Sequence, residues 1–118
     1  MDKEIIDVHI HFGAPKDDQS GCYWSEEFTK TAAYYAMLLL TRTLFEKVDI
    51  ERIKTHLLGA INGSKYVNKS VLLAMDQVYD ENGAVHTERT HLFVPNRYIA
   101  SLAKENSRVL LGGSVHPY

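Results

Sequence analysis

Cysteine occurs once in this 118-residue sequence, at Cys22, so the chain has no partner thiol for an internal disulfide. A single cysteine agrees with a reducing compartment. Long apolar runs are also lacking, because the longest, at 36–40, is far shorter than the roughly 20 residues that cross a bilayer. The first residues, Met-Asp-Lys-Glu, do not have a signal-peptide pattern. Together these features predict a cytoplasmic protein.

An excess of charge of either sign is missing as well. The sequence has 13 Lys and Arg residues against 15 Asp and Glu residues, which gives a net charge of -2. This balance argues against the basic surface of proteins that bind nucleic acid or anionic membranes, and we expect neither partner. The hydrophobic content of 45% and charged content of 24% are those of a globular domain.

Two histidines one residue apart, His9 and His11, stand in a short apolar segment at 5–13 that predicts a β-strand. Because side chains alternate along a strand, the segment divides into two faces: Ile6, Val8 and Ile10 on one, and Asp7, His9 and His11 on the other. Residues i and i+2 lie roughly 6–7 Å apart, so both imidazoles can reach one ion at about 2.1 Å. The pair is a candidate metal half-site; the alternative is two ordinary polar residues on the wet face of a strand.

Two helices are expected after a polar loop at 14–24. The first runs from about 26 to 47, with Ser25 as its N-cap and apolar residues at helical spacing. The second begins at Asp49 and stops at Asn62-Gly63.

The remaining sequence predicts a buried strand at 71–75, a third helix at 97–105 and a third strand at 108–115. Between the second strand and the third helix, the turn signal Asn82-Gly83 predicts a small hairpin or an irregular excursion. The order strand, helices, strand, helix, strand is that of right-handed βαβ units. We therefore expect an α/β fold whose parallel sheet holds its strands in sequence order.

Polar residues follow each predicted strand: His9 and His11 the first, Asp76 the second and His116 the third. Parallel α/β proteins build their sites at this edge. Asp76 therefore either lines a substrate mouth or simply starts a loop or caps a helix. Trp24, in the loop after the histidines, is a candidate for substrate contact. Asp7 either orients a ligand histidine or makes a strand-end hydrogen bond.

The opening segment Ile-Ile-Asp-Val-His-Ile-His-Phe-Gly resembles the first strand of the amidohydrolase superfamily, metal-dependent hydrolases built on a distorted TIM barrel. Further on, Phe-Val-Pro-Asn-Arg-Tyr at 93–98 and Gly-Gly-Ser-Val-His-Pro-Tyr at 112–118 are similar to the third helix and strand of its amidohydrolase-2 branch, which includes decarboxylases of the aminocarboxymuconate type. The resemblance runs from end to end, and the first strand is its most specific part.

This resemblance implies that His9 and His11 are the first two ligands of a divalent metal, usually zinc. The metal-bound water of such enzymes attacks an electrophilic carbon, here of a small carbonyl or carboxylate substrate. The resemblance also implies that His116 lies on the rim of the site, where it either contacts the substrate or supports a ligand, and is not itself a metal ligand. It leaves open the substrate, the metal and the choice between hydrolysis and decarboxylation.

The chain departs from the family pattern in length. A (β/α)8 barrel takes about 250 residues, and this sequence supplies about three of the eight strands. The later histidine ligands and the aspartate that acts as general base have no counterpart. The resemblance thus implies that 1–118 is a single N-terminal segment of such a barrel, without a catalytic residue of its own. We expect it to be inactive alone and to bind zinc weakly or not at all.

A different class of function is also open, a non-catalytic α/β module that acts through assembly. A three-stranded sheet cut from a barrel exposes strand edges that pair readily. We therefore expect a homo-oligomer or association with the missing part of the barrel.

Overall fold

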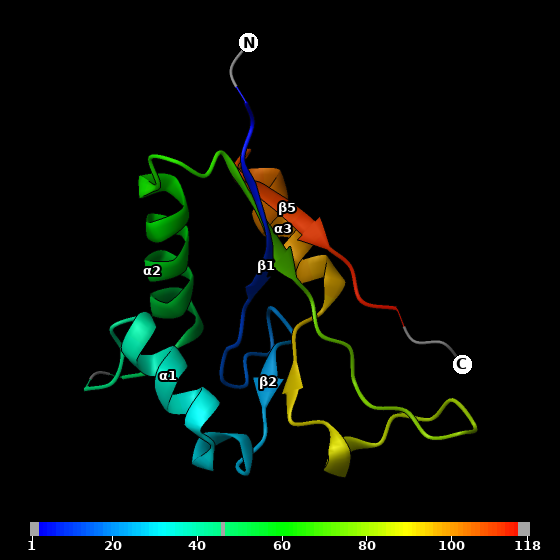
Figure 1. Ribbon diagram of the computed structural model, residues 1–118. Helices are drawn as coiled ribbons and strands as arrows, with labels where there is room; N and C mark the ends of the chain where they lie inside the picture. The colour runs from blue at the N-terminus through cyan, green and yellow to red at the C-terminus, as the bar shows by residue number, and fades with distance from the viewer. Residues whose placement is uncertain (1–2, 46, 116–118) are drawn as a thin grey trace.

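The protein has a mixed α/β fold in the computed structural model, which describes residues 3–45 and 47–115 (Figure 1). Its main sheet is parallel, in the order β1-β3-β5, and the bounds of these strands are Ile6–His11, Lys69–Leu73 and Val109–Gly112. A second, antiparallel sheet pairs β2 (Tyr23–Trp24) with β4 (Leu92–Phe93). The predicted parallel sheet and its strand order are confirmed.

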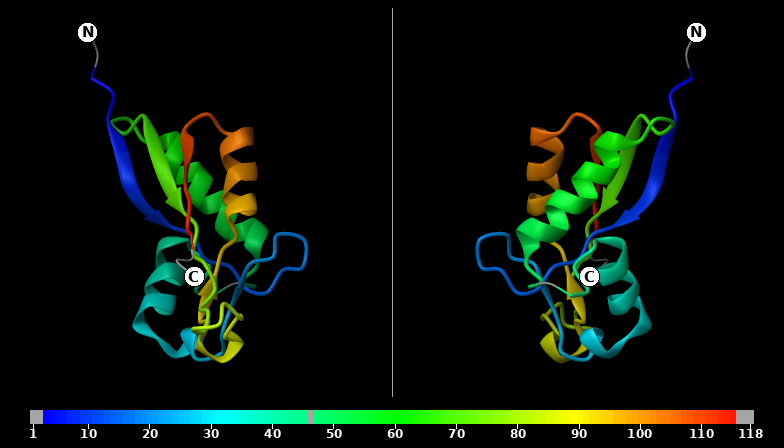
Figure 2. Two further views of the ribbon diagram at one scale, coloured as in Figure 1. Left: turned by 90° about the vertical axis from the view of Figure 1, so that its right-hand side faces the viewer. Right: turned by 90° about the vertical axis from the view of Figure 1, so that its left-hand side faces the viewer.

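Three α-helices accompany these sheets: α1 (Ala32–Leu40), α2 (Ile50–Gly63) and α3 (Asn96–Glu105). Short 3-10 turns occur at η1 (Phe28–Lys30) and η2 (Thr87–Arg89). In Figures 1 and 2, α1, β2 and β4 lie beyond the carboxyl ends of the parallel strands, whereas α2 and α3 lie alongside the sheet. Within the part of the chain that the structure describes, no helix has the length and apolar character needed to cross a membrane.

The second and third helices form where the sequence predicts them. At the start of α2, the carboxylate of Asp49 accepts a hydrogen bond from the Arg52 N–H at 2.9 Å, which satisfies one of the free donors of the first turn. The apolar residues of α2 then recur on one side, so that Ile53 and Ile61 are buried. In α3, Ile99 and Leu102 are buried in the same way.

The predicted single helix at 26–47 is wrong. The Ser25 hydroxyl does accept the Phe28 N–H, at 3.0 Å, but the residues after it form the 3-10 turn η1 rather than an α-helix. A second cap, Thr31, then starts α1 by accepting the Tyr34 N–H at 3.2 Å. The helix ends at Leu40, and Arg42 lies in the left-handed region at φ 57°, which a continuing helix does not allow.

The core lies on the side of the sheet that faces α2 and α3. Along β3 the burial alternates: Ser70 and Leu72 are buried, whereas Val71 and Leu73 are only partly so. Leu72 belongs to the cluster of buried residues that joins both helices to the sheet. The opposite face of the sheet is therefore less well covered by the described residues.

Strand β1 forms one edge of the parallel sheet and is irregular. Its register with β3 pairs Asp7 with Ser70 and Ile10 with Leu72, so β1 has one residue more than β3 in this interval. The predicted strict alternation, with Ile6 and Ile10 on one face and Asp7 with the histidines on the other, is therefore wrong. By register, Asp7 and Ile10 share the side of the buried β3 residues.

A hairpin occurs at the predicted turn. Tyr79 and Val85 form an antiparallel bridge, and Gly83 adopts φ +82°, a conformation that favours glycine. The carboxylate of Asp80 accepts the N–H groups of Asn82 and Ala84, each at 2.9 Å, and holds the turn closed.

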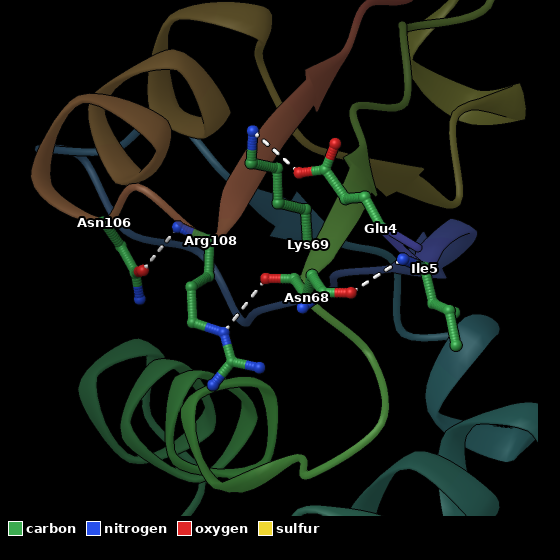
Figure 3. A network of polar contacts seen from close by, with 6 residues as sticks. All are labelled: Glu4, Ile5, Asn68, Lys69, Asn106 and Arg108. Atoms are coloured by element: carbon green, nitrogen blue, oxygen red, sulfur yellow. Dashed lines mark hydrogen bonds and ion pairs between the residues drawn. The ribbon is translucent and has the colours of Figure 1, made fainter. Parts of the chain in front are cut away.

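At the amino ends of the parallel strands, Arg108 connects β5 to the end of α2 and to Asn68, the latter contact being drawn in Figure 3. Its guanidinium donates to the carbonyls of Asn62 at 2.6 Å, Ser64 at 3.0 Å and Asn68 at 3.1 Å, and also to that of Val67. The side chain of Asn68 in turn accepts the Ile5 N–H at 2.7 Å. This network fixes all three strands at the end of the sheet opposite to His11.

Candidate functional site

The two histidines of β1 meet at the carboxyl-end half of the strand. Both are exposed, and their Nε2 atoms lie 2.9 Å apart. The rings are nearly perpendicular, with centroids 4.7 Å apart and an interplanar angle of 81°. Despite the irregularity of β1, His9 and His11 therefore share a side of the strand, as the sequence predicts.

This arrangement has two chemical uses. In the protein alone, one Nε2–H donates to the other Nε2, which accepts through its lone pair. With both rings neutral and both lone pairs turned to a common ion, the same atoms become two ligands. Two nitrogens on one tetrahedral zinc ion lie roughly 3.4 Å apart, so the observed pair needs only a small opening to fit.

Asp7 does not take part in this pair. Its carboxylate accepts the main-chain N–H of His9 at 3.1 Å, which is the strand-end hydrogen bond that the sequence left as one alternative. Among the residues that the structure describes, no group of three His, Cys, Asp or Glu side chains is placed to hold a metal ion. The site is thus a pair of imidazoles and not a complete ligand set.

A pocket of about 620 Å³ opens beside the histidine pair. The imidazoles of His9 and His11 line it together with residues from α1, α2 and the loops after the strands; among them are Phe28, Met37, Leu40, Leu57 and Met75. These side chains are apolar. The two histidines and Thr41 are therefore the polar residues of an otherwise apolar lining.

Asp76 follows β3 and is partly buried, outside the residues that line this pocket. Its main-chain N–H donates to the Ser114 hydroxyl at 3.2 Å, and its carboxylate accepts from the Gln77 N–H at 2.8 Å and from the Tyr79 hydroxyl at 3.4 Å. Burial, followed by the charge of Asp76, raises the pKa of Tyr79 above its ordinary value. Asp76 thus organises its own loop, and its contact with substrate stays a prediction.

Trp24 lies in β2 as part of an aromatic cluster. Its ring centroid is 5.8 Å from that of Phe28 and 5.3 Å from that of Tyr34. Phe28 lines the pocket, whereas Trp24 contacts Phe28 and does not line it. The prediction that Trp24 contacts substrate is not tested by this position, and His116 lies outside the described residues.

A contact between Ser25 and His91 has no signal in the sequence. The Ser25 hydroxyl and the His91 Nδ1 are 2.8 Å apart, and the Ser25 N–H donates to the His91 carbonyl, also at 2.8 Å. Strands β2 and β4 bring these residues together across 66 positions, and both strands are too short to show a period.

The role of α1 in the pocket also went unpredicted, although its sequence, Ala-Ala-Tyr-Tyr-Ala-Met-Leu-Leu-Leu, is apolar on every side.

Cys22 is buried, and burial raises the pKa of its thiol above the ordinary value. A hydrogen bond with Ser20 opposes this shift only in part. Burial and the raised pKa both favour the protonated thiol at neutral pH, the form that is less reactive than the thiolate. This agrees with the sequence, which places no histidine or acid at ligand spacing beside it.

No protein-family model, curated protein or solved structure matches this chain.

Proposed function

We propose that this chain is the N-terminal part of a metal-dependent hydrolase or decarboxylase of the amidohydrolase type, in which His9 and His11 hold a divalent ion, zinc before other metals. The observation that carries the proposal is the 2.9 Å separation of the two Nε2 atoms on an exposed strand beside a pocket. The parallel order β1-β3-β5, with helices between the strands, is also what the first three strands of a (β/α)8 barrel require.

Zinc bound here would supply a water whose pKa falls toward about 7, and so a hydroxide at neutral pH. The contribution of this chain is the neutral imidazole pair and the shape of the pocket beside it. Zinc favours four ligands, so two imidazoles bind it weakly and the remaining ligands belong to another part of the protein or to a partner. The general base of the reaction belongs there as well.

Calorimetric titration with zinc chloride tests this proposal. We expect weak one-to-one binding by the wild-type chain, and at least a tenfold loss of affinity in both His9→Ala and His11→Ala. The matched control is His56→Ala, which removes an imidazole from α2. Circular dichroism before each titration establishes that the variants fold. Equal zinc affinity in all four proteins would contradict the assignment of the two ligands.

The assembly module remains a second candidate because of the apolar surface beyond the carboxyl ends of the strands. Leu39, Leu40 and Phe45 are 66%, 82% and 95% exposed, and Val8 on the edge strand is 67% exposed. The radius of gyration, 15.0 Å, also exceeds the roughly 13.5 Å of a compact chain of this length. Under this proposal the chain is non-catalytic and acts by oligomerisation with further copies of itself.

Light scattering after size-exclusion chromatography separates the two candidates. For an assembly module we expect a stable oligomer at micromolar concentration that the His9→Ala and His11→Ala changes leave intact. A monomer at that concentration would contradict self-assembly and leave the metal site as the better explanation.

A further inference from the structure

The pocket beside the histidine pair has an unusual composition for a site next to a candidate metal. Of the described residues that line it, none is Asp, Glu, Lys or Arg. Apart from the two imidazoles, Thr41 provides the one polar side chain among them. Within the described lining, the two imidazoles are therefore the groups best suited to meet a charged or strongly polar group of a ligand.

The size and the walls of the pocket suit a small molecule. Its volume of about 620 Å³ falls within the roughly 300–1,000 Å³ of small-molecule sites. Two of the lining side chains are the flexible thioethers of Met37 in α1 and Met75 after β3, which adapt readily to aromatic or branched groups. Phe28, from the 3-10 turn η1 before α1, adds an aromatic ring to the lining.

We infer that this pocket binds the uncharged, apolar body of a substrate, an aromatic ring or a branched alkyl group, whose single carbonyl group points to His9 and His11. The inference deepens the proposed function and rests on it, because it takes the histidine pair as the reacting end. It names the substrate class as a neutral carbonyl compound rather than one with charge distributed along its length.

The physical reason is the cost of burying a charge. A carboxylate or ammonium group on the body of the ligand would lose part of its hydration against a described lining that has no opposite charge to pair with it. An apolar group of the same size gains free energy instead, because it leaves water and covers the exposed side chain of Leu40. The apolar part of the lining therefore selects against charge on the body of the ligand.

Two nearly isosteric ketones test this selection. 4-Methylacetophenone is neutral throughout, whereas 4-acetylbenzoate has a carboxylate at the end opposite to its carbonyl. Each is titrated into metal-free protein labelled with 13C at the methionine methyl groups, and the signals of Met37 and Met75 report binding. We expect saturable shifts of both signals with 4-methylacetophenone, and at least tenfold weaker binding of 4-acetylbenzoate.

Two variants of α1 test whether the ketone binds in this pocket. Ala36 and Ala32 are both exposed in α1, one turn apart, but Ala36 lines the pocket and Ala32 does not. Ala36→Phe fills the space that the ketone needs, and we expect at least a tenfold loss of affinity. Ala32→Phe adds the same ring outside the pocket and leaves the affinity unchanged; circular dichroism checks that both variants keep their helices.

Three results would overturn the inference: no saturable shift in the wild-type protein, equal affinity for the two ketones, or equal affinity in Ala36→Phe and Ala32→Phe. The zinc titration distinguishes a failure of this inference from a failure of the proposed metal site. Ketone binding by a protein that does not bind zinc would support the pocket and contradict the metal. Zinc binding without ketone binding would support the metal and overturn the pocket.

Discussion

The guanidinium of Arg108 donates a hydrogen bond to the main-chain carbonyl of Asn62, in the last turn of α2, at 2.6 Å. The carbonyls at the end of a helix have no partner within the helix, and a cation also complements the negative end of the helix dipole. Arg108 thus acts as a C-terminal cap supplied from 46 residues away. It joins the end of α2 to the start of β5.

Removal of this cap should destabilise the protein. We expect Arg108→Met to lower the free energy of unfolding by about 2–3 kcal/mol, because several main-chain carbonyls lose a charged donor. Urea denaturation followed by circular dichroism measures the change. Arg108→Lys retains the charge but not the planar set of donors, so its free energy of unfolding should lie between those of the wild type and Arg108→Met. The control Arg89→Met, at an exposed position in η2, should change stability by less than about 0.5 kcal/mol.

Two glycines should respond in opposite ways to alanine. A Cβ at Gly112 would lie 2.5 Å from Leu73 Cδ2, 2.9 Å from Val71 Cγ1 and 3.2 Å from the Leu72 carbonyl oxygen. We expect Gly112→Ala to lower the free energy of unfolding by about 1–3 kcal/mol through this overpacking.

Gly59 provides the contrast, because it lies within α2 and a Cβ there would meet nothing within 4 Å. Gly59→Ala should raise the free energy of unfolding by up to about 1 kcal/mol, since alanine favours the helix. Both values come from the same urea experiment. A stabilising Gly112→Ala would show that β3 moves aside at no cost.

Cys22 should resist modification in the folded protein. Its side chain is buried and its thiol pKa is raised by that burial, so Ellman's reagent should react only after unfolding. The raised pKa also makes stability depend on pH. The protonated thiol of the folded state contributes fully below the pKa of an exposed thiol, near 8.5, and this contribution is lost as the pH rises toward the higher folded value.

The measurement is the rate of thiol modification and the urea midpoint between pH 7 and 9.5. Cys22→Ala lacks the titrating group, so its urea midpoint should fall less over this range than that of the wild type. Rapid labelling of the native protein at pH 7 would contradict the buried position of the thiol.

Asn96 should stabilise the segment after β5. Its side-chain amide donates to the Ser114 carbonyl at 2.8 Å, while its side-chain oxygen accepts the Ser114 N–H, also at 2.8 Å. We expect Asn96→Ala to speed hydrogen exchange of the Ser114 amide at least tenfold, because the alanine leaves that N–H without its partner. Exchange of the Ile99 amide, inside α3, serves as the control and should change less.

The sheet could be predicted because each parallel strand has its own local signal. The apolar run around Leu72 stands between polar residues, and the same is true of the run around Val109. The cap at Asp49 and the turn at Gly83 likewise depend on near neighbours. The approach of His9 to His11 was predicted for the same reason, since it depends on residues only two positions apart.

The features that could not be predicted depend on pairs that are distant in the sequence. Apolar residues at helical spacing occur on both sides of Thr31, which hides the new start there, and no local pattern marks Arg42 as left-handed. The irregular register of β1 depends on its fit to β3, and no local pattern encodes it. The pocket beside His11 likewise forms only when α1 folds against the strand ends.

The position of β1 also bears on the order in which the protein folds. The contact between Ile5 and Asn68 closes 63 residues of chain, whereas the contact between Asn68 and Arg108 closes 40. Closing the longer loop costs more entropy, and β1 is an edge strand with its residues largely exposed, so little burial offsets that cost. We therefore expect β3, α3 and β5 to form the folding nucleus and β1 to dock after the rate-limiting step. The histidine pair would then be assembled last, and a ligand that holds it would slow unfolding without speeding folding.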